Sequence, residues 1–284
     1  MEIGTMNFKT NYHTHCTFCD GKNTAEEMVL SAIEKGFDIL GFSSHSMYPF
    51  ASSWHIPVKN HAAYVATIKE LTQKYKDKIS ILCGFEADFI EGFCAPDKEA
   101  YSEFSPDYLI GSVHYVPGDK GYYEADGNSQ KVREAIDKYY GGDVKKAVQR
   151  YFQIERQMLK SCSFDIIGHP DLIRKQNSTE QLFCEDDDWY KQEVIQTVQA
   201  IADAKVCVEI NTGGMARGYM KTPFPSMFFL EQLNKKNVPI TINSDSHSKD
   251  TLDYWFEEAV DYAKKAGYKE VSYFTKEGMK KQEI

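Results

Sequence analysis

The chain has 284 residues, of which 42% are hydrophobic and 13% aromatic, which is enough for a globular protein with a sizeable core. Forty-two acidic residues against thirty-three basic ones give a formal charge of −9, and no basic run of the kind that follows nucleic-acid phosphates is present in the sequence. Binding to nucleic acid or to an anionic membrane through overall charge is therefore disfavoured.

The N-terminal sequence carries no apolar core behind basic residues, and no stretch of the sequence reaches the roughly 18 apolar residues of a membrane span. We therefore expect a cytoplasmic protein. The chain has seven scattered cysteines, an odd number, which favours reduced thiols over a disulfide framework.

Apolar, β-branched segments alternate with segments of helical period along the chain. The expected buried strands cover 8–15, 38–45, 79–87, 107–114, 164–171, 206–214 and 239–247. The expected helices cover 24–36, 61–76, 143–161, 188–204, 226–236 and 251–266. This alternation predicts parallel βαβ units, and the lack of a Gly/Ser/Pro-rich linker favours one closed α/β barrel over 1–284. We expect 115–142, rich in Gly, Asp and Tyr, to be an irregular loop over one end of the barrel.

The first expected strand runs into NYHTHCTFCDG, whose polar residues allow different interpretations. Cys16 and Cys19 could be a redox pair or half of a structural zinc site. His13 and His15 lie on the same side of a strand, because side chains alternate with period two, and with Asp20 they could begin a catalytic metal site. These interpretations predict different proteins.

Further histidines and acidic residues follow the C-terminal ends of the later expected strands. Together with the first motif they form the set His13, His15, Asp20, His45, Glu86, His114, His169, Asp245 and His247. The C-terminal strand ends of a β/α barrel converge on one face, so these residues would meet there. Imidazole and carboxylate ligands suit zinc, iron or manganese.

Nine such residues are too many for one ion, because four-coordinate zinc takes three or four protein ligands. The set therefore predicts two or three ions that share carboxylates, and Glu86 is the best candidate for a bridge. Such a cluster can activate a bridging water and neutralise charge on a phosphoryl group.

The order of these motifs resembles the PHP (polymerase and histidinol phosphatase) family and, within it, the histidinol-phosphatase branch. The resemblance covers essentially the whole chain through the segments YHTHCTFCDG, GFSSHS, GFEADF, IGSVHYV, DIIGHPDLIRK, EINTGG with ARG, and INSDSH. It implies a single distorted, TIM-like (β/α)7 barrel with two to three divalent transition-metal ions (Zn, Fe or Mn) at the C-terminal ends of the strands. The implied ligand sets are His13, His15, Glu86 and Asp245 for one ion, Glu86, His114 and His169 for a second, and Asp20, His45 and His247 for a third.

A phosphate monoester would need cations besides the metals in so acidic a chain. Arg174 and Arg217 follow strand ends, and guanidinium geometry suits bidentate phosphate binding. Their similarity to substrate-binding arginines of this branch adds to that expectation. The segment SMYPFASSWH places four aromatic-ring residues after His45, and they either form a lid over the substrate or cover the apolar rim of the barrel: Tyr48, Phe50, Trp54 and His55. Asp88 could meet an amine or imidazole of the substrate, or could simply be solvated.

The resemblance implies hydrolysis of the small-molecule phosphate monoester L-histidinol phosphate to L-histidinol and phosphate, late in histidine biosynthesis. A metal-bridging hydroxide would attack phosphorus, with Glu86, Asp245 and His247 as catalytic residues. The nearest alternative is a PHP phosphoesterase that acts on nucleotides or other small phosphate esters. The sequence does not indicate the oligomeric state.

Two other classes fit the sequence less well. An amidohydrolase-type barrel also begins with a strand-borne His-x-His, but it normally uses a carbamylated lysine or a similar bridge, whereas here the central candidate is Glu86. A non-catalytic zinc module needs a second cysteine pair in register with Cys16 and Cys19, and the remaining cysteines offer none. We therefore expect these two cysteines to pack in the core or line the wall of the site.

Overall fold

The computed structural model describes residues 8–119, 121–178 and 180–284. Seven parallel strands form the central sheet in the order β1 (Thr10–Asn11), β2 (Ile39–Phe42), β4 (Ser80–Asp88), β5 (Tyr108–Ser112), β8 (Ile166–Ile167), β9 (Cys207–Asn211) and β10 (Ile240–Asn243). A further short strand, β3 (His45–Ser46), continues beside β4. Apart from β4, these strands are shorter than the sequence segments that predicted them, because their polar ends leave the sheet as loops.

The first and last strands meet just beyond their C-terminal ends. Thr14 forms a parallel bridge with Ser246, where the amide of His15 donates to the carbonyl of Ser246 at 2.9 Å. The amide of Ser246 in turn donates to the carbonyl of His13 at 3.1 Å. The sheet therefore forms the nearly closed (β/α) barrel that the alternating pattern predicted.

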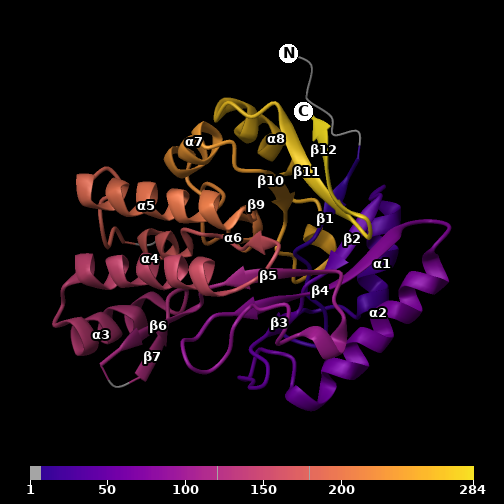
Figure 1. Ribbon diagram of the computed structural model, residues 1–284, viewed down its shortest axis with the longest axis horizontal. Coiled ribbons are helices and arrows are strands. Elements are labelled where there is room, and N and C mark those ends of the chain that lie inside the picture. Colours follow the sequence, from indigo (N-terminus) through magenta and orange to yellow (C-terminus); the bar gives the residue numbers. More distant parts are fainter. Residues whose placement is uncertain (1–7, 120, 179) are drawn as a thin grey trace.

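Six helices that alternate with the strands along the chain cover the outside of the barrel (Figure 1). They are α1 (Ala25–Glu34), α2 (His61–Tyr75), α4 (Val144–Ser161), α5 (Asp188–Ala204), α7 (Met227–Lys235) and α8 (Phe256–Lys265). Helix α1 begins with the capping box of Thr24 and Glu27, each side chain accepting a hydrogen bond from the other residue's amide. Helix α8 begins five residues later than its apolar period predicts, because Trp255 adopts left-handed backbone angles there.

The barrel interior holds a small, separate core of large side chains. Its buried members are Tyr12, Ile39, Leu82, Tyr108, Ile110, Ile166, Cys207 and Phe274. The hydroxyl of Tyr108 donates to the carbonyl oxygens of Tyr12 and Phe42 at 2.5 and 3.0 Å. A Cβ at Gly84 would lie 2.7 Å from the Tyr108 ring, so glycine is needed where this ring crosses the sheet.

Two segments differ from the sequence expectation. The segment 115–142 is not an irregular loop: it forms the hairpin β6 (Tyr115–Gly118) and β7 (Gly121–Glu124), and then helix α3 (Ser129–Tyr140). Asn128 caps this helix, and Val132, Ala135 and Ile136 bury one face of it, a pattern hidden beside the segment's glycines and charges. The C-terminal residues form a second, unpredicted hairpin, β11 (Glu270–Thr275) with β12 (Gly278–Glu283).

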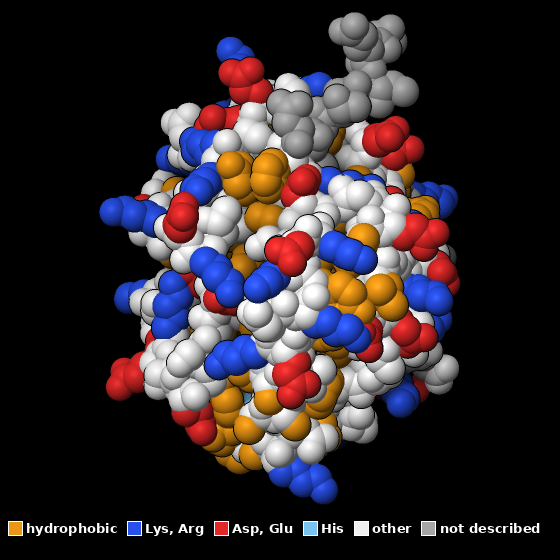
Figure 2. Space-filling view, turned by 90° about the vertical axis from the view of Figure 1, so that its right-hand side faces the viewer, with side chains coloured by type: hydrophobic (Ala, Val, Ile, Leu, Met, Phe, Trp, Pro, Cys, Tyr) orange, Lys and Arg blue, Asp and Glu red, His pale blue; other side chains and the backbone are white. Residues whose placement is uncertain are grey.

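The surface shown in Figure 2 mixes lysine and arginine with aspartate and glutamate, with no continuous basic stripe across its described part. In the described ranges, no helix combines the length and apolar character needed to cross a bilayer.

Candidate metal centre

The predicted ligands lie where strands end at one mouth of the barrel. His13 follows β1, His114 follows β5, His169 follows β8 and Asp245 follows β10, each two residues beyond the last paired strand residue. His45 pairs in register with Glu86 across β3 and β4. His169 and Asp245 adopt positive φ values of 23° and 46°, which are uncommon for residues with side chains and which recur at functional sites.

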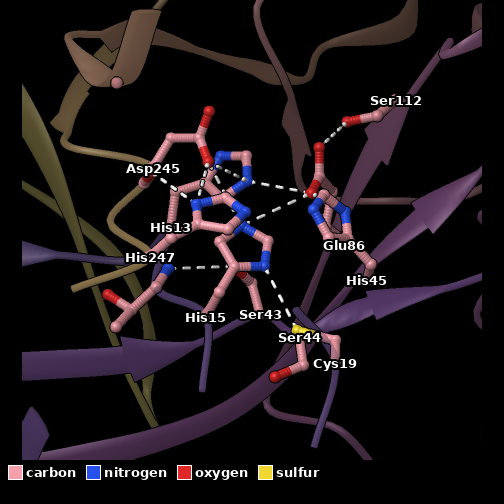
Figure 3. Close-up of polar contacts among 12 residues, drawn as sticks. His13, His15, Cys19, Ser43, Ser44, His45, Glu86, Ser112, Asp245 and His247 are labelled. Atoms are coloured by element: carbon pink, nitrogen blue, oxygen red, sulfur yellow. Dashed lines mark hydrogen bonds and ion pairs between the residues drawn. The ribbon is translucent and has the colours of Figure 1, made fainter. Parts of the chain in front are cut away.

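Glu86 lies at the centre of this group. Its Oε2 is 2.6 Å from His45 Nδ1 and 3.1 Å from His13 Nε2. Its Oε1 is 2.9 Å from His169 Nε2 and accepts a hydrogen bond from Ser112 at 2.8 Å. Figure 3 shows Glu86 and His45 facing His13 and His15 across this space. A single buried carboxylate thus faces histidines from several strands.

Asp245 and Asp20 extend the group toward the surface. Asp245 Oδ1 lies 3.2 Å from His15 Nε2 and 3.5 Å from His247 Nδ1. Asp20 Oδ1 lies 3.3 Å from His247 Nε2 and 3.7 Å from His45 Nε2. His45 therefore faces Glu86 with one ring nitrogen and Asp20 with the other. All nine predicted ligands are brought together, with only Asp20 and His247 reaching appreciably into solvent.

Four overlapping groups of these residues hold their donor atoms within 4.8 Å of one another. The groups are His15, Asp20, His45 and His247; His13, His15 and Asp245; His13, Glu86 and His169; and His45, Glu86 and His114. The first and second groups are similar to two of the ligand sets that the family resemblance implied. His114 and His169, expected around one ion, fall in different groups that share Glu86.

Several buried side-chain nitrogen and oxygen atoms that could coordinate a metal lack hydrogen-bond partners in the centre. His13 Nε2, His15 Nε2, His45 Nδ1 and Glu86 Oε2 approach one another closely, but in the described part of the chain none forms a hydrogen bond. Buried polar atoms are ordinarily hydrogen-bonded, so four orphaned atoms facing one space indicate a missing positive partner. Imidazole nitrogen and carboxylate oxygen are donors that fit a divalent transition metal.

The protonation of the centre follows from burial and neighbouring charge. Burial would raise the pKa of Glu86, but the imidazoles of His13, His45 and His114 hold it well below its usual range. Burial lowers the pKa of His15 well below its ordinary value, and neighbouring histidines lower it further. Glu86 is therefore ionised and His15 neutral, the states in which both can coordinate a cation.

Two other imidazoles of the centre have raised pKa values, in contrast to His15. Burial would lower the pKa of His13, but Glu209, Glu86 and Asp245 raise it well above its ordinary value. The pKa of His114 rises to about 10, because its carboxylate neighbours outweigh burial. A cation that binds here must displace these protons.

Two carboxylates behind the histidines orient them. Glu209, in the middle of β9, accepts from His13 Nδ1 at 2.9 Å and from Asn243 Nδ2 at 2.9 Å. The sequence analysis missed Glu209, and its signal was an acidic residue inside the apolar strand VCVEI. Asp88 is neither solvated nor in the cavity: it is 1% exposed and joins His114 Nδ1 at 2.7 Å to His55 Nε2 at 2.5 Å. Such partners fix the tautomer and direction of metal-binding histidines.

A cavity of about 340 Å³ opens over the centre. Its lining includes His45, His114 and Asp245 of the candidate ligands, together with Trp54 and Arg217. Glu124, at the end of β7, and Asp126 and Gly127, in the turn that follows β7, line one side of the cavity. The segment 115–142 therefore does cover this end of the barrel, although in folded form. A larger hollow of about 770 Å³ lies by β10 and the β11–β12 hairpin and contains none of the predicted ligands.

The two predicted phosphate-binding arginines occupy different places. Arg217 follows the short helix α6 (Gly213–Ala216), donates to Asp245 Oδ2 at 2.9 Å and lines the cavity. Arg174 does not line it: the residue is 5% exposed, and its side chain donates to Glu185 Oε2 at 2.8 Å and to Thr222 Oγ1 at 3.0 Å. The next residue, Lys175, reaches the cavity instead.

The predicted aromatic lid is reduced to one residue. Trp54 lines the cavity, whereas Tyr48 packs against Phe104 with ring centroids 5.1 Å apart, and Phe50 is 47% exposed. Cys19 Sγ lies 3.6 Å from His15 Nδ1, at the wall of the centre. All seven cysteines are free, as the sequence predicted.

Comparison with known proteins points in one direction. The sequence pattern of the PHP domain matches residues 11–213. The histidinol-phosphatase of Bacillus subtilis is 24% identical over 268 residues, which cover 88% of this chain and 97% of that protein.

Two solved structures share the fold. A histidinol phosphate phosphatase from Lactococcus lactis, crystallised with zinc, L-histidinol and phosphate, superimposes with a TM-score of 0.74 at 21% identity, over 96% of this chain and 98% of that one. A Listeria monocytogenes protein presented as a candidate histidinol phosphatase gives a TM-score of 0.79 at 21% identity, over 88% of this chain and 99% of that one.

Proposed function

The chain belongs to the PHP domain family, and from this premise we propose that it is a metal-dependent phosphomonoesterase that hydrolyses L-histidinol phosphate to L-histidinol and phosphate. The observation that carries the proposal is the convergence of nine ligand-type residues at one mouth of the barrel, where six of them line a cavity together with two cations, Arg217 and Lys175. The names of the similar bacterial proteins support the choice of substrate. The reaction would belong to histidine biosynthesis.

The four groups of donor atoms would hold two to three divalent ions, with Glu86 shared between them. When bound, such ions lower the pKa of a bridging water and neutralise charge that develops on a phosphoryl group. Glu209 and Asp88 would keep His13 and His114 aimed at the centre.

The chain's own residues would bind and orient the ester. Arg217 already donates to Asp245 at the edge of the cavity, where its guanidinium can turn to a phosphate oxygen. Lys175, whose Nζ pairs with Asp126, also lines the cavity and supplies a second positive charge. Asp245 and His247 lie 3.5 Å apart beside Arg217. Burial would raise the pKa of Asp245, but Arg217 and His13 hold it well below its ordinary value, so Asp245 would act as a carboxylate.

The test is phosphate release by the metal-reconstituted protein from a panel of esters: L-histidinol phosphate, nucleoside monophosphates, nucleoside bisphosphates and a simple aryl phosphate. The expected result is a kcat/KM for L-histidinol phosphate at least about tenfold above every other ester, equivalent to about 1.4 kcal/mol of transition-state preference. A preference for nucleotides would overturn the substrate and favour another PHP phosphoesterase.

Glu86→Ala is the matched inactive variant for this assay. Removing the shared carboxylate should lower kcat by about 10³-fold or more, since several kcal/mol of charge stabilisation depend on the ions it holds. The far-ultraviolet circular dichroism should stay that of the wild type. A folded Glu86→Ala variant with normal turnover would contradict the proposed centre.

A further inference from the structure

The carboxylates that line the cavity differ in the partners they have. Among the described residues, four carboxylates line it: Asp20, Glu124, Asp126 and Asp245. Asp20 and Asp245 belong to the candidate metal centre. Asp126 is paired with Lys175, whose Nζ lies 3.3 Å from its Oδ2. Glu124 is the lining carboxylate that has neither a cationic partner nor a place in the centre.

Glu124 is the last residue of β7, on the hairpin that covers the barrel mouth. In the described part of the chain, the one side chain that donates a hydrogen bond to its carboxylate is Trp54, through Nε1 to Oε1 at 3.3 Å. A neutral indole N–H leaves the negative charge of the carboxylate uncompensated. Exposed carboxylates are commonly only solvated, but this one is held against the wall of a ligand-sized cavity.

Trp54 sets how far this charge lies from the centre. Its ring system packs nearly perpendicular to the rings of His45 and His114, with ring centroids 4.7 and 5.3 Å away. Its indole also stacks on His55 at 3.7 Å, and His55 is itself bonded to the buried Asp88. The indole therefore contacts two candidate ligands and His55, and its N–H bonds the carboxylate of Glu124.

The proposed substrate has charges with a matching order. Its phosphate is joined through a short carbon chain to an ammonium group that is cationic at neutral pH, and then to an imidazole. Arg217, Trp54 and Glu124 line the same cavity. With the phosphate at the metal centre beside Arg217, the ammonium group would lie near Trp54 and the carboxylate of Glu124.

We propose that Glu124 determines specificity by binding the substrate's ammonium group, with Trp54 as the positioning residue that holds the carboxylate in place. This inference rests on the proposed function and adds to it the chemical class of ester accepted: phosphates of amino alcohols, ahead of phosphates of neutral alcohols. The segment 115–142 thus supplies the specificity of the site, while the strand ends supply its chemistry.

The experiment compares two esters on metal-loaded wild type and Glu124→Gln. One is L-histidinol phosphate, and the other is imidazolylpropyl phosphate, which has the same skeleton without the amino group. Loss of a charge-assisted contact should lower kcat/KM for L-histidinol phosphate by about tenfold to a hundredfold and leave the deamino ester within about twofold. Trp54→Phe, which keeps an aromatic ring but loses the N–H, should lower the ratio of the two kcat/KM values in the same direction by a smaller factor.

Glu134→Gln is the matched control, an exposed carboxylate on α3 of the same segment, bonded to Gln130 and absent from the cavity lining. It should leave both esters unchanged. An equal fall for both esters with Glu124→Gln, or no fall for either, would overturn this inference while the function stands. Failure of the wild type to act on L-histidinol phosphate would overturn both proposals.

Discussion

Individual side chains in the centre are placed by residues that a substrate would never touch. Glu86 contacts histidines that follow several strands, but a hydrogen bond from Ser112 fixes the direction of its carboxylate. Glu209 fixes the direction of the His13 ring in the same way. Neighbouring residues can have unrelated roles: Arg174 is enclosed by carboxylate, hydroxyl and carbonyl oxygens, while Lys175 faces the cavity.

The two arginines should separate binding from stability. Arg217→Lys should lower kcat/KM by about tenfold or more, because a point charge replaces a bidentate donor. It should barely change the melting temperature. Arg174→Met leaves the buried Asp171 and the half-buried Glu185 without their cation, and should lower the free energy of unfolding by about 3 kcal/mol.

Thermal melts and steady-state kinetics of both variants check this prediction. An Arg174→Met protein that is as stable as the wild type but binds phosphate esters weakly would instead support the sequence expectation for Arg174.

Glu155 gives a prediction for stability against pH. Burial in α4 raises the pKa of this carboxyl well above its ordinary value of 4.5, outweighing the hydrogen bond from Tyr151. The native state therefore holds the proton more tightly than the unfolded chain does. The corresponding stability is fully present below pH 4.5 and is lost as pH rises through the native pKa.

Glu155→Gln mimics the protonated carboxyl at every pH. Its melting temperature minus that of the wild type should therefore increase from pH 5 to pH 8, each kcal/mol of removed penalty corresponding to about 2–4 °C. Calorimetry at several pH values measures this difference, and a constant difference would show that Glu155 does not titrate in that window.

At the scale of elements, the C-terminal hairpin closes the barrel at the end away from the centre. Phe274 of β11 is 8% exposed and joins the barrel's interior core. Its backbone donates to the Tyr12 hydroxyl at 2.8 Å, and that hydroxyl donates back to its carbonyl at 3.0 Å. The hairpin, seen in yellow in Figure 1, thus packs against the residues that follow the first strand.

Phe274→Ala should lower the free energy of unfolding by about 3–5 kcal/mol, because a large buried ring is removed from a closed core. Met279→Ala is the control: Met279 pairs with Phe274 across the hairpin but is 44% exposed, so its loss should cost under about 0.5 kcal/mol. Denaturant titrations of both variants give the two values. Similar values for the two would mean that the hairpin does not stabilise the barrel.

At the scale of the molecule, ions should couple the strands that supply their ligands. The candidate donors come from both ends of the chain, from His13 near β1 to His247 after β10. A ligand that binds only the folded state stabilises it, by about 4 kcal/mol at a thousandfold excess over its Kd.

Removal of the metals by a chelator should therefore abolish phosphatase activity and lower the melting temperature by several degrees, and both should return with added zinc, manganese or iron. Elemental analysis should find two to three ions per chain before chelation. Unchanged activity and melting temperature in protein shown to be metal-free would contradict the model of the centre.

The sequence by itself determined the barrel class, most strands and helices, and the nine candidate ligands at or just beyond the strand ends. These features are local: strand and helix periods depend on neighbouring residues, and the C-terminal ends of parallel strands must share one face. The excursion 115–142 and the C-terminal hairpin escaped prediction because short hairpins and a capped polar helix have weak periodic signals.

Only the tertiary structure decided which side chains meet. Glu209 and Asp88 became the supports of His13 and His114 because separate strands bring them within 2.9 and 2.7 Å. Arg174 and Lys175 are adjacent in one 3₁₀ helix, Leu172–Asn177, and successive residues of such a helix point in different directions. The side chain of Arg174 therefore enters a buried network, while that of Lys175 lines the cavity. Sequence therefore specified the chemistry of NYHTHCTFCDG and its distant partners, while packing across the barrel specified the direction of each group.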